Sequence, residues 1–188
     1  MRRWELISQL IKHYNLKSGA ELGVWKGATF KYLADRHPDV LLYGVDLYAA
    51  QPDNKGPERW VAGENGHEWD HDKYRKDLEQ FCSARNNCTL MVKSTREASN
   101  YIVDGSLDFV FIDADHSYEG VTNDLRWWVP KVREGGLIIG HDIDWDGVKR
   151  AVEMRFGNNY FVSPDNCWWL LNPPHEGGNK DKLYNSLY

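Results

Sequence analysis

Hydrophobic residues along the chain follow two alternating patterns, a helical spacing of three and four residues and short apolar runs typical of buried strands. In the first segment, Ile7, Leu10 and Ile11 lie on one face of a predicted helix at residues 2–14. The helical pattern recurs at 29–36, 70–81, 95–102 and 148–156, and in one segment with Val121, Leu125, Trp128 and Val132 on a single stripe. The strand pattern occurs at 20–24, 40–45, 89–92, 107–112 and 137–139, and then at 160–162 and 167–171 as a closing antiparallel pair. Because strands alternate with helices, we predict an α/β fold with a parallel, doubly wound sheet.

Two segments interrupt this rhythm. Residues 49–69 are rich in Gly, Pro and Asn and carry Trp60 and Trp69, so we interpret them as a lid or substrate loop, with a solvated surface loop as the alternative. Residues 173–188 are polar and are predicted to be a loose tail. The length of 188 residues fits one domain, which we place at 1–172.

Composition narrows the classes of function. The net charge of −5 argues against a protein that binds nucleic acid by attraction to phosphates. The three cysteines lack a CxxC pair, which argues against a disulfide framework or a zinc knuckle. No apolar run is long enough for a transmembrane helix, and the first residues lack the apolar core of a signal peptide. We therefore expect a cytoplasmic protein with a small-molecule partner, and no pattern predicts an oligomeric state.

A glycine turn follows the first predicted strand. Gly23 and Gly27 let the backbone approach a ligand closely, but Glu21 occupies the position where a dinucleotide site needs its first glycine. A carboxylate there repels a pyrophosphate and attracts an ammonium group. Asp46 ends the second strand, where a carboxylate can accept both hydroxyls of a ribose. A ligand with a ribose, an ammonium group and no diphosphate is S-adenosylmethionine (SAM), although a tight turn with incidental acids is the alternative.

Acidic residues and histidines follow the fourth and fifth predicted strands. Asp113 and His116 follow one strand, and His141 and Asp142 follow the other. Neighbouring parallel strands lie about 4.8 Å apart, so we expect these side chains to meet at one edge of the sheet. Oxygen ligands with an imidazole suit Mg²⁺ or Mn²⁺, which can lower the pKa of a substrate hydroxyl, and His116 can accept the proton. The alternatives are a pocket role for His141 and helix caps at Asp115 or Ser117 and at Asp144 or Asp146.

The motifs together resemble a known family. The set Glu21-x-Gly23-x3-Gly27, Asp46, IDADHSYEGV and GGLIIGHD is similar to class I SAM-dependent methyltransferases, and more narrowly to methyltransferase family 24, over about residues 18–171. Ala114 stands where that family commonly has glycine. The resemblance implies a Rossmann-like, seven-stranded sheet with one antiparallel strand. It also implies Glu21 and Gly23 near the methionine moiety, Asp46 on the ribose, metal ligands at Asp113, His141 and Asp142, and His116 as the catalytic base.

We therefore predict a SAM-dependent methyltransferase that methylates a hydroxyl of a sugar, phenol or other metabolite with the help of a divalent metal. The predicted cofactor contacts are Glu21, Gly23, Gly27, Asp46, Ser94 and Asp113, and the predicted catalytic residues are Asp113 and His116. A SAM-binding protein without catalysis is the alternative.

A remote alternative is a zinc hydrolase, because residues 67–71 match the HExxH pattern. That pattern needs His67 and His71 on one helical face, whereas the preceding Gly-Glu-Asn-Gly lets a helix begin only near Asp70.

Overall fold

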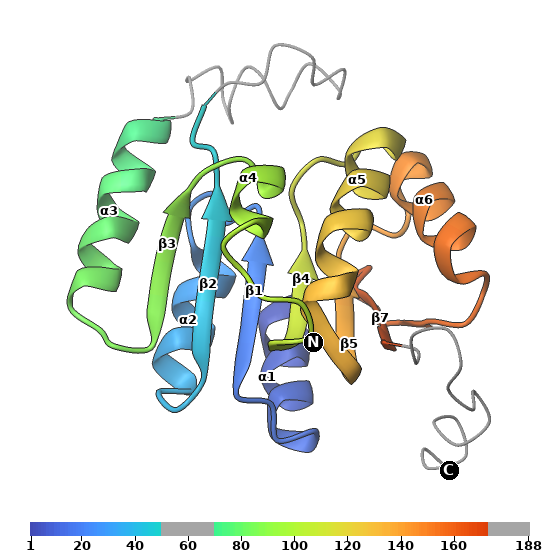
Figure 1. Ribbon diagram of the computed structural model, residues 1–188, viewed down its shortest axis with the longest axis horizontal. Coiled ribbons are helices and arrows are strands. Elements are labelled where there is room, and N and C mark those ends of the chain that lie inside the picture. The colour runs from blue at the N-terminus through green and yellow to red at the C-terminus, as the bar shows by residue number, and fades with distance from the viewer. Residues whose placement is uncertain (50–69, 173–188) are drawn as a thin grey trace.

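The computed structural model describes residues 1–49 and 70–172 (Figure 1). The predicted lid at 49–69, except for its first residue, and the predicted tail at 173–188 lie outside the described residues. Within the described part of the chain, no helix is long and apolar enough to cross a membrane. The cytoplasmic location stays a prediction.

The described residues form one sheet of seven strands in the order β3-β2-β1-β4-β5-β7-β6. Its first five strands are parallel, and β7 runs antiparallel to both β5 and β6, as the family resemblance implied. The strands are β1 (Ser18–Leu22), β2 (Leu41–Asp46), β3 (Cys88–Val92), β4 (Leu107–Ile112), β5 (Val132–Gly140), β6 (Phe161–Val162) and β7 (Trp168–Leu171). The order reverses at β1 and β4, so the switch point of the sheet lies between these two central strands.

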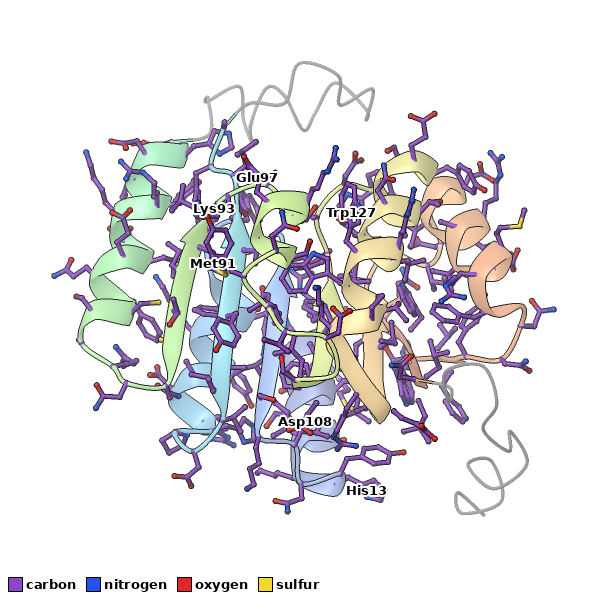
Figure 2. The ribbon with its side chains drawn as sticks, in the orientation of Figure 1. His13, Met91, Lys93, Glu97, Asp108 and Trp127 are labelled. Atoms are coloured by element: carbon purple, nitrogen blue, oxygen red, sulfur yellow. The ribbon has the colours of Figure 1, made fainter. Side chains whose placement is uncertain are left out.

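Helices cover both faces of the sheet (Figure 1). They are α1 (Arg3–His13), α2 (Ala28–Arg36), α3 (His71–Ser83), α4 (Thr95–Ser99), α5 (Tyr118–Trp128), the short 3-10 helix η3 (Val129–Lys131) and α6 (Asp146–Phe156). Buried residues of α1, α2 and α3 form one core with one face of the sheet, and α4, α5 and α6 form a second core with the other face. Met91 and Trp127, labelled in Figure 2, pack against the second core.

Strand β4 shows why two cores form. Phe109 and Phe111 belong to the core under α1 and α2, whereas Val110 and Ile112 belong to the core under α5. Successive side chains of a strand point to opposite faces, so an uninterrupted apolar run is what a strand buried on both faces requires. The apolar residues 109–112 therefore indicated a buried strand, and the predicted range 107–112 agrees with β4.

The ends of β1 and α4 differ from the sequence prediction. Strand β1 ends at Leu22 rather than residue 24, because Gly23 has a φ of 84° and turns the chain. Helix α4 ends at Ser99 rather than residue 102, and Tyr101 and Ile102 instead donate to carbonyls three residues back. The short turns keep Ile102 buried without extending the helix.

The helix with Val121 and Leu125 ends just before Pro130, as a proline at this place predicts, whereas Val132 lies in a different element from the predicted one. Helix α5 ends at Trp128, and η3 follows with Pro130 in its first turn, because proline lacks the N–H that a continuing helix needs. Val132, predicted on the helix stripe, begins β5 instead, yet it is fully buried. Strand β5 begins before the predicted strand at 137–139, and Gly135 and Gly136 lie within it, where the register with β4 shifts between Leu107 and Phe109.

Candidate active site

The carboxyl edge of the sheet, meaning the residues at and just after the C-terminal ends of β1, β2, β4 and β5, brings the predicted site residues together. Glu21 lies on β1 opposite Phe111 of β4, and its side chain is buried with Oε2 lacking a hydrogen-bond partner among the described residues. Burial raises the pKa of Glu21 well above its ordinary range, and the charges of Asp113 and Asp46 add to the rise, although Arg3 opposes it. A buried carboxyl with an unsatisfied oxygen is costly, so it is a candidate to receive a ligand donor.

The glycine turn after β1 packs against the strand beside it. A Cβ on Gly23 would lie 2.2 Å from the carbonyl oxygen of Asp113, so only glycine allows this approach. Gly27 has a φ of 77° and is the N-cap of α2, and a Cβ there would meet the side chain of Leu78 on α3. The requirement at Gly27 therefore comes from helix packing and from backbone conformation.

Asp46 holds the same turn in place. Its Oδ2 accepts a hydrogen bond from the backbone N–H of Trp25 at 2.7 Å, and its Oδ1 accepts one from the N–H of Tyr48 at 2.8 Å. The Tyr48 hydroxyl in turn donates to the Trp25 carbonyl at 3.0 Å. Trp25 and Tyr48 both adopt positive φ, a conformation that these contacts sustain. Each carboxylate oxygen retains a second lone pair for a ligand hydroxyl.

Two aspartates and two histidines meet after β4 and β5. The His116 Nε2 atom lies 2.8 Å from Oδ2 of Asp142 and 3.6 Å from Oδ1 of Asp113. The His141 Nδ1 atom lies 3.0 Å from Oδ1 of Asp142 and 3.9 Å from Oδ1 of Asp113. Asp142 thus bridges both imidazoles, and its φ of 54° is a left-handed conformation that an aspartate tolerates.

The charges of this cluster shift its titration. Burial lowers the pKa of His116, but hydrogen bonds and charges from Asp113 and Asp142 outweigh it and raise the pKa to about 9. Burial also lowers the pKa of His141, but the hydrogen bond with Asp142 and the charges of Asp113 and Asp142 outweigh burial and raise it. Burial raises the pKa of Asp142, but hydrogen bonds from both histidines outweigh it and hold the pKa well below its usual range. A pKa of about 9 favours the protonated form of His116 at neutral pH in this arrangement.

The donor set fits a divalent cation. Asp113, His141 and Asp142 each offer one ligand atom, and these atoms lie within 4.8 Å of one another. The Nε2 atom of His141 is buried and has no hydrogen-bond partner among the described residues. Two carboxylates and an imidazole are ligands that Mg²⁺ or Mn²⁺ accepts.

Other predicted residues have local structural roles. Ser94 is the N-cap of α4, where its Oγ accepts from the Glu97 N–H at 3.2 Å and donates to Oε2 of Glu97 at 2.7 Å. Ser117 is the N-cap of α5, which settles one of the alternatives left open by the sequence. Trp145 is the N-cap of α6 and makes no side-chain cap, so neither Asp144 nor Asp146 caps that helix.

The HExxH segment is described only in part. Helix α3 begins at His71, close to the predicted start near Asp70, and Asp70 caps it, while His67 lies outside the described residues. The metal-ligand group found in the described ranges does not include His71.

Sequence reasoning missed Arg3 and Trp145. Arg3, on α1, lies with its Nε 3.7 Å from Oδ2 of Asp113, far away in sequence. The ring of Trp145 lies 4.9 Å from that of His116 between centroids. No motif marks either residue, because the fold alone brings α1 and the segment before α6 to this edge.

Comparisons with known proteins agree with this geometry. The model of methyltransferase family 24, described as a methyltransferase domain, matches residues 20–143, and no curated protein sequence matches the chain. The chain is similar to the structure of the O-methyltransferase NovP, with 18% identity and a TM-score of 0.63, over 92% of this chain and 80% of that one. It is also similar to the crystal structure of the calicheamicin methyltransferase CalS11, with 16% identity and a TM-score of 0.63, over 88% of this chain and 77% of that one. A third similar structure is cofactor-bound Rv0187 from MTB, with 16% identity and a TM-score of 0.62, over 92% of this chain and 80% of that one.

At these identities the structural likeness shows the fold, whereas the family model covers most of the chain, including the glycine turn and the Asp113 and His141-Asp142 segments. The chain therefore belongs to methyltransferase family 24, and it is a SAM-dependent methyltransferase with the class I fold.

Proposed function

We propose that this methyltransferase transfers the methyl group of SAM to a hydroxyl of a small molecule, and that Asp113, His141 and Asp142 hold a divalent cation beside that hydroxyl. The observation that carries the proposal is the convergence of these three ligand groups within 4.8 Å at the carboxyl edge. Two neighbouring carboxylates repel each other unless cations balance them. The two histidines also contact Asp142, at 2.8 and 3.0 Å, and contribute to that balance when protonated.

The residues of the edge divide the work of binding. Glu21 offers a buried acceptor for the ammonium group of SAM, and the turn from Gly23 to Gly27 brings the backbone close to the ligand. Asp46 is in position to accept ribose hydroxyls while it holds the turn through Trp25. When bound, SAM supplies an electrophilic methyl group, and a divalent cation supplies positive charge that favours the ionised form of an acceptor hydroxyl. Much of the rate enhancement comes from holding the acceptor oxygen in line with the methyl group.

His116 is the candidate to accept the proton of the hydroxyl at its Nε2 atom. That atom faces both Asp113 and Asp142, whose negative charges raise the pKa of His116. Neutralising these charges lowers the pKa of His116 toward the range where an imidazole works as a base. The same aspartates therefore set both the affinity for a cation and the protonation state of His116.

A ring-shaped acceptor fits the surroundings of His116. The half-buried Trp145 packs against its imidazole and offers a flat apolar surface of the kind that aromatic and sugar rings use. The structural neighbour CalS11 is described as a TDP-rhamnose 3'-O-methyltransferase, which supports a sugar hydroxyl as one acceptor class. We therefore propose sugars and phenols as the first acceptors to test.

Titration with Mn²⁺ tests the cation site without a known acceptor. We expect the wild-type protein to bind Mn²⁺ in a calorimeter and Asp142→Asn to lose most of that binding, because asparagine keeps the left-handed backbone but removes the charge. Asp144→Asn is the matched control, since Asp144 is an exposed acid two residues away, and it should bind as the wild type does. Equal Mn²⁺ affinity in Asp142→Asn would rule out this site.

Methyl transfer itself is measured as release of S-adenosylhomocysteine from a panel of phenols and sugars. A chelator should abolish turnover while SAM binding survives, and Mg²⁺ or Mn²⁺ should restore it. Full turnover in the chelator would remove the cation from the proposal and leave His116 as the activating residue.

A further inference from the structure

Arg3 is anchored at the carboxyl edge by three contacts. Its backbone N–H donates to Oδ2 of Asp165 at 2.6 Å, and its side-chain Nε donates to Oγ1 of Thr29 at 3.2 Å. The same Nε lies 3.7 Å from Oδ2 of Asp113. A side chain held at both its backbone and its guanidinium loses little further conformational entropy when it binds a ligand.

The side-chain contacts of Arg3 leave most of its donors available. Within the described part of the chain, both its hydrogen bond and its ion pair use Nε, whereas Nη1 and Nη2 carry four of the five guanidinium N–H groups. A guanidinium with free terminal nitrogens is suited to binding a carboxylate through two parallel hydrogen bonds. The side chain is 27% exposed, so a ligand can reach it.

The start of helix α2 adds to this preference for an anion. Thr29, the partner of Arg3, is the second residue of α2, whose N-cap Gly27 provides no side-chain acceptor. The first turn of α2 also contains no acidic residue. The N–H groups of a first helical turn have no partners within the helix and favour negative charge.

Glu21 supplies the opposite preference nearby. Its side chain is only 4% exposed, and its Oε2 has no hydrogen-bond partner among the described residues. The backbone N–H of Asp113 donates to the carbonyl of Leu22, the residue after Glu21, at 2.9 Å, and Nε of Arg3 lies 3.7 Å from the Asp113 carboxylate. Asp113 therefore brings the buried acceptor and the anchored cation to one site.

We propose that Arg3 binds the α-carboxylate of the methionine moiety of SAM while Glu21 accepts its ammonium group. Arg3 and Glu21 then recognise the two charges of the amino acid as a pair, which neither residue does alone. The proposal rests on the binding of SAM at the carboxyl edge. The rival is that Arg3 serves only Asp113, as an internal cation that competes with the divalent metal.

Two ligands that differ only in the carboxylate separate these roles. S-adenosylhomocysteine carries the carboxylate, and its decarboxylated analogue keeps the thioether, the adenosine and the ammonium group. We expect Arg3→Gln to weaken binding of S-adenosylhomocysteine by about 10- to 100-fold, because a charge-assisted carboxylate contact is lost. Binding of the decarboxylated analogue should change by less than about threefold. Calorimetry with the full-length protein measures both affinities.

Arg2→Gln is the matched control, because Arg2 is the exposed neighbour on the same segment and should leave both affinities unchanged. Equal weakening of both ligands in Arg3→Gln, or no weakening of either, would overturn the proposal. A rise in Mn²⁺ affinity in Arg3→Gln with unchanged ligand selectivity would assign Arg3 to Asp113 instead. If the wild-type protein binds neither ligand, the SAM-binding site itself is misplaced, which is a different failure.

Discussion

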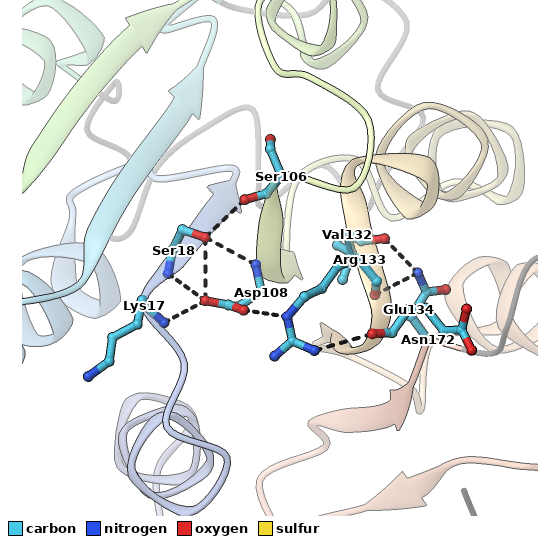
Figure 3. Close-up of polar contacts among 8 residues, drawn as sticks. All are labelled: Lys17, Ser18, Ser106, Asp108, Val132, Arg133, Glu134 and Asn172. Atoms are coloured by element: carbon cyan, nitrogen blue, oxygen red, sulfur yellow. Dashed lines mark hydrogen bonds and ion pairs between the residues drawn. The ribbon is translucent and has the colours of Figure 1, made fainter. Parts of the chain in front are cut away.

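Asp108 at the amino edge of the sheet and Glu21 at its carboxyl edge differ in how far hydrogen bonds satisfy their carboxylates. At the amino edge, where β1, β4 and β5 begin, Asp108 receives hydrogen bonds from the backbone N–H groups of Lys17 and Ser18 at 2.6 and 3.0 Å and from Nε of Arg133 at 2.6 Å (Figure 3). Asn172 donates through Nδ2 to the carbonyls of Val132 and Arg133 at the same edge. These contacts tie the starts of three strands and the end of β7 together.

At the carboxyl edge, polar atoms are left open instead. Glu21 is more deeply buried than Asp108, yet its Oε2 has no partner among the described residues. Burial raises the pKa of both groups, but the hydrogen bonds to Asp108 outweigh burial and lower its pKa, whereas the pKa of Glu21 rises. Figure 2 labels Asp108 on the side where the parallel strands begin and Glu97, on α4, on the side where they end.

Between Asp108 and Glu21, the satisfaction of hydrogen bonds separates the structural carboxylate from the candidate ligand-binding one. Asp46 combines both roles, because it accepts two backbone N–H groups and retains lone pairs for a ligand. A carboxylate satisfied by the protein stabilises the fold. A carboxylate that folding leaves unsatisfied lowers stability and gains its partner when a ligand binds. Variants at each edge should therefore fail in different assays.

The largest effect is expected at Asp113. Asp113→Asn should lower methyl transfer by about 100-fold or more, because it removes a ligand charge and alters the surroundings of His116. The free energy of unfolding should change by less than about 1 kcal/mol, since no backbone N–H depends on this carboxylate among the described residues. Turnover and urea unfolding measure the two quantities, and a large loss of stability would place Asp113 with the structural carboxylates.

Asp108 should show the reverse pattern. Asp108→Ala should lower the free energy of unfolding by about 2–3 kcal/mol, because the N–H groups of Lys17 and Ser18 and the Arg133 guanidinium lose their acceptor. The affinity for S-adenosylhomocysteine should stay the same. Asp104→Ala is the control, because Asp104 is exposed and its ion pair with Lys131 should contribute less than about 1 kcal/mol. Similar losses in the two variants would contradict the role of Asp108.

The two edges should also differ in their dependence on pH. The pKa of Glu21 is raised from its ordinary value of 4.5, so the folded protein binds this proton more tightly than the unfolded chain does. The wild-type protein should therefore lose stability relative to Glu21→Gln as pH rises from about 5 to 8. Asp108, with a lowered pKa, contributes stability above its ordinary value of 3.8 and loses it as pH falls through its folded-state pKa. Urea unfolding of the wild-type protein, Glu21→Gln and Asp108→Ala at several pH values measures both dependences. Parallel curves of unfolding free energy against pH for the wild-type protein and Glu21→Gln would contradict the first expectation.

The smallest effect is expected at Ser94, for which the sequence predicts a cofactor contact and the structure shows a helix cap. Ser94→Ala should cost about 1 kcal/mol of stability, whereas Ser94→Asn should keep most of it, because asparagine is an equally preferred cap that can also donate to Glu97. The affinity of both variants for S-adenosylhomocysteine tests the predicted cofactor contact of Ser94. A loss of affinity in both supports the cofactor contact, and a loss confined to Ser94→Ala reflects the cap alone.

The sequence predicted the alternation of elements because burial on two faces demands a visible pattern. Residues 109–112 are apolar on both sides of strand β4, and the helix with Val121 and Leu125 keeps one apolar stripe. Boundaries that depend on backbone conformation were less visible. Gly23 ends β1 through its positive φ, and Gly135 lies within β5 rather than in a turn between elements.

Chain order and local chemistry by themselves determined which carboxylates and histidines reach the carboxyl edge, because parallel strands place all their C-terminal ends on one side. Only the tertiary structure decided how those groups pair. It placed Arg3 of α1 beside Asp113, Trp145 against His116, and both histidines on Asp142. The physical reason is that distances, burial and hydrogen-bond partners depend on contacts between segments that are distant in sequence, and no local pattern records such contacts.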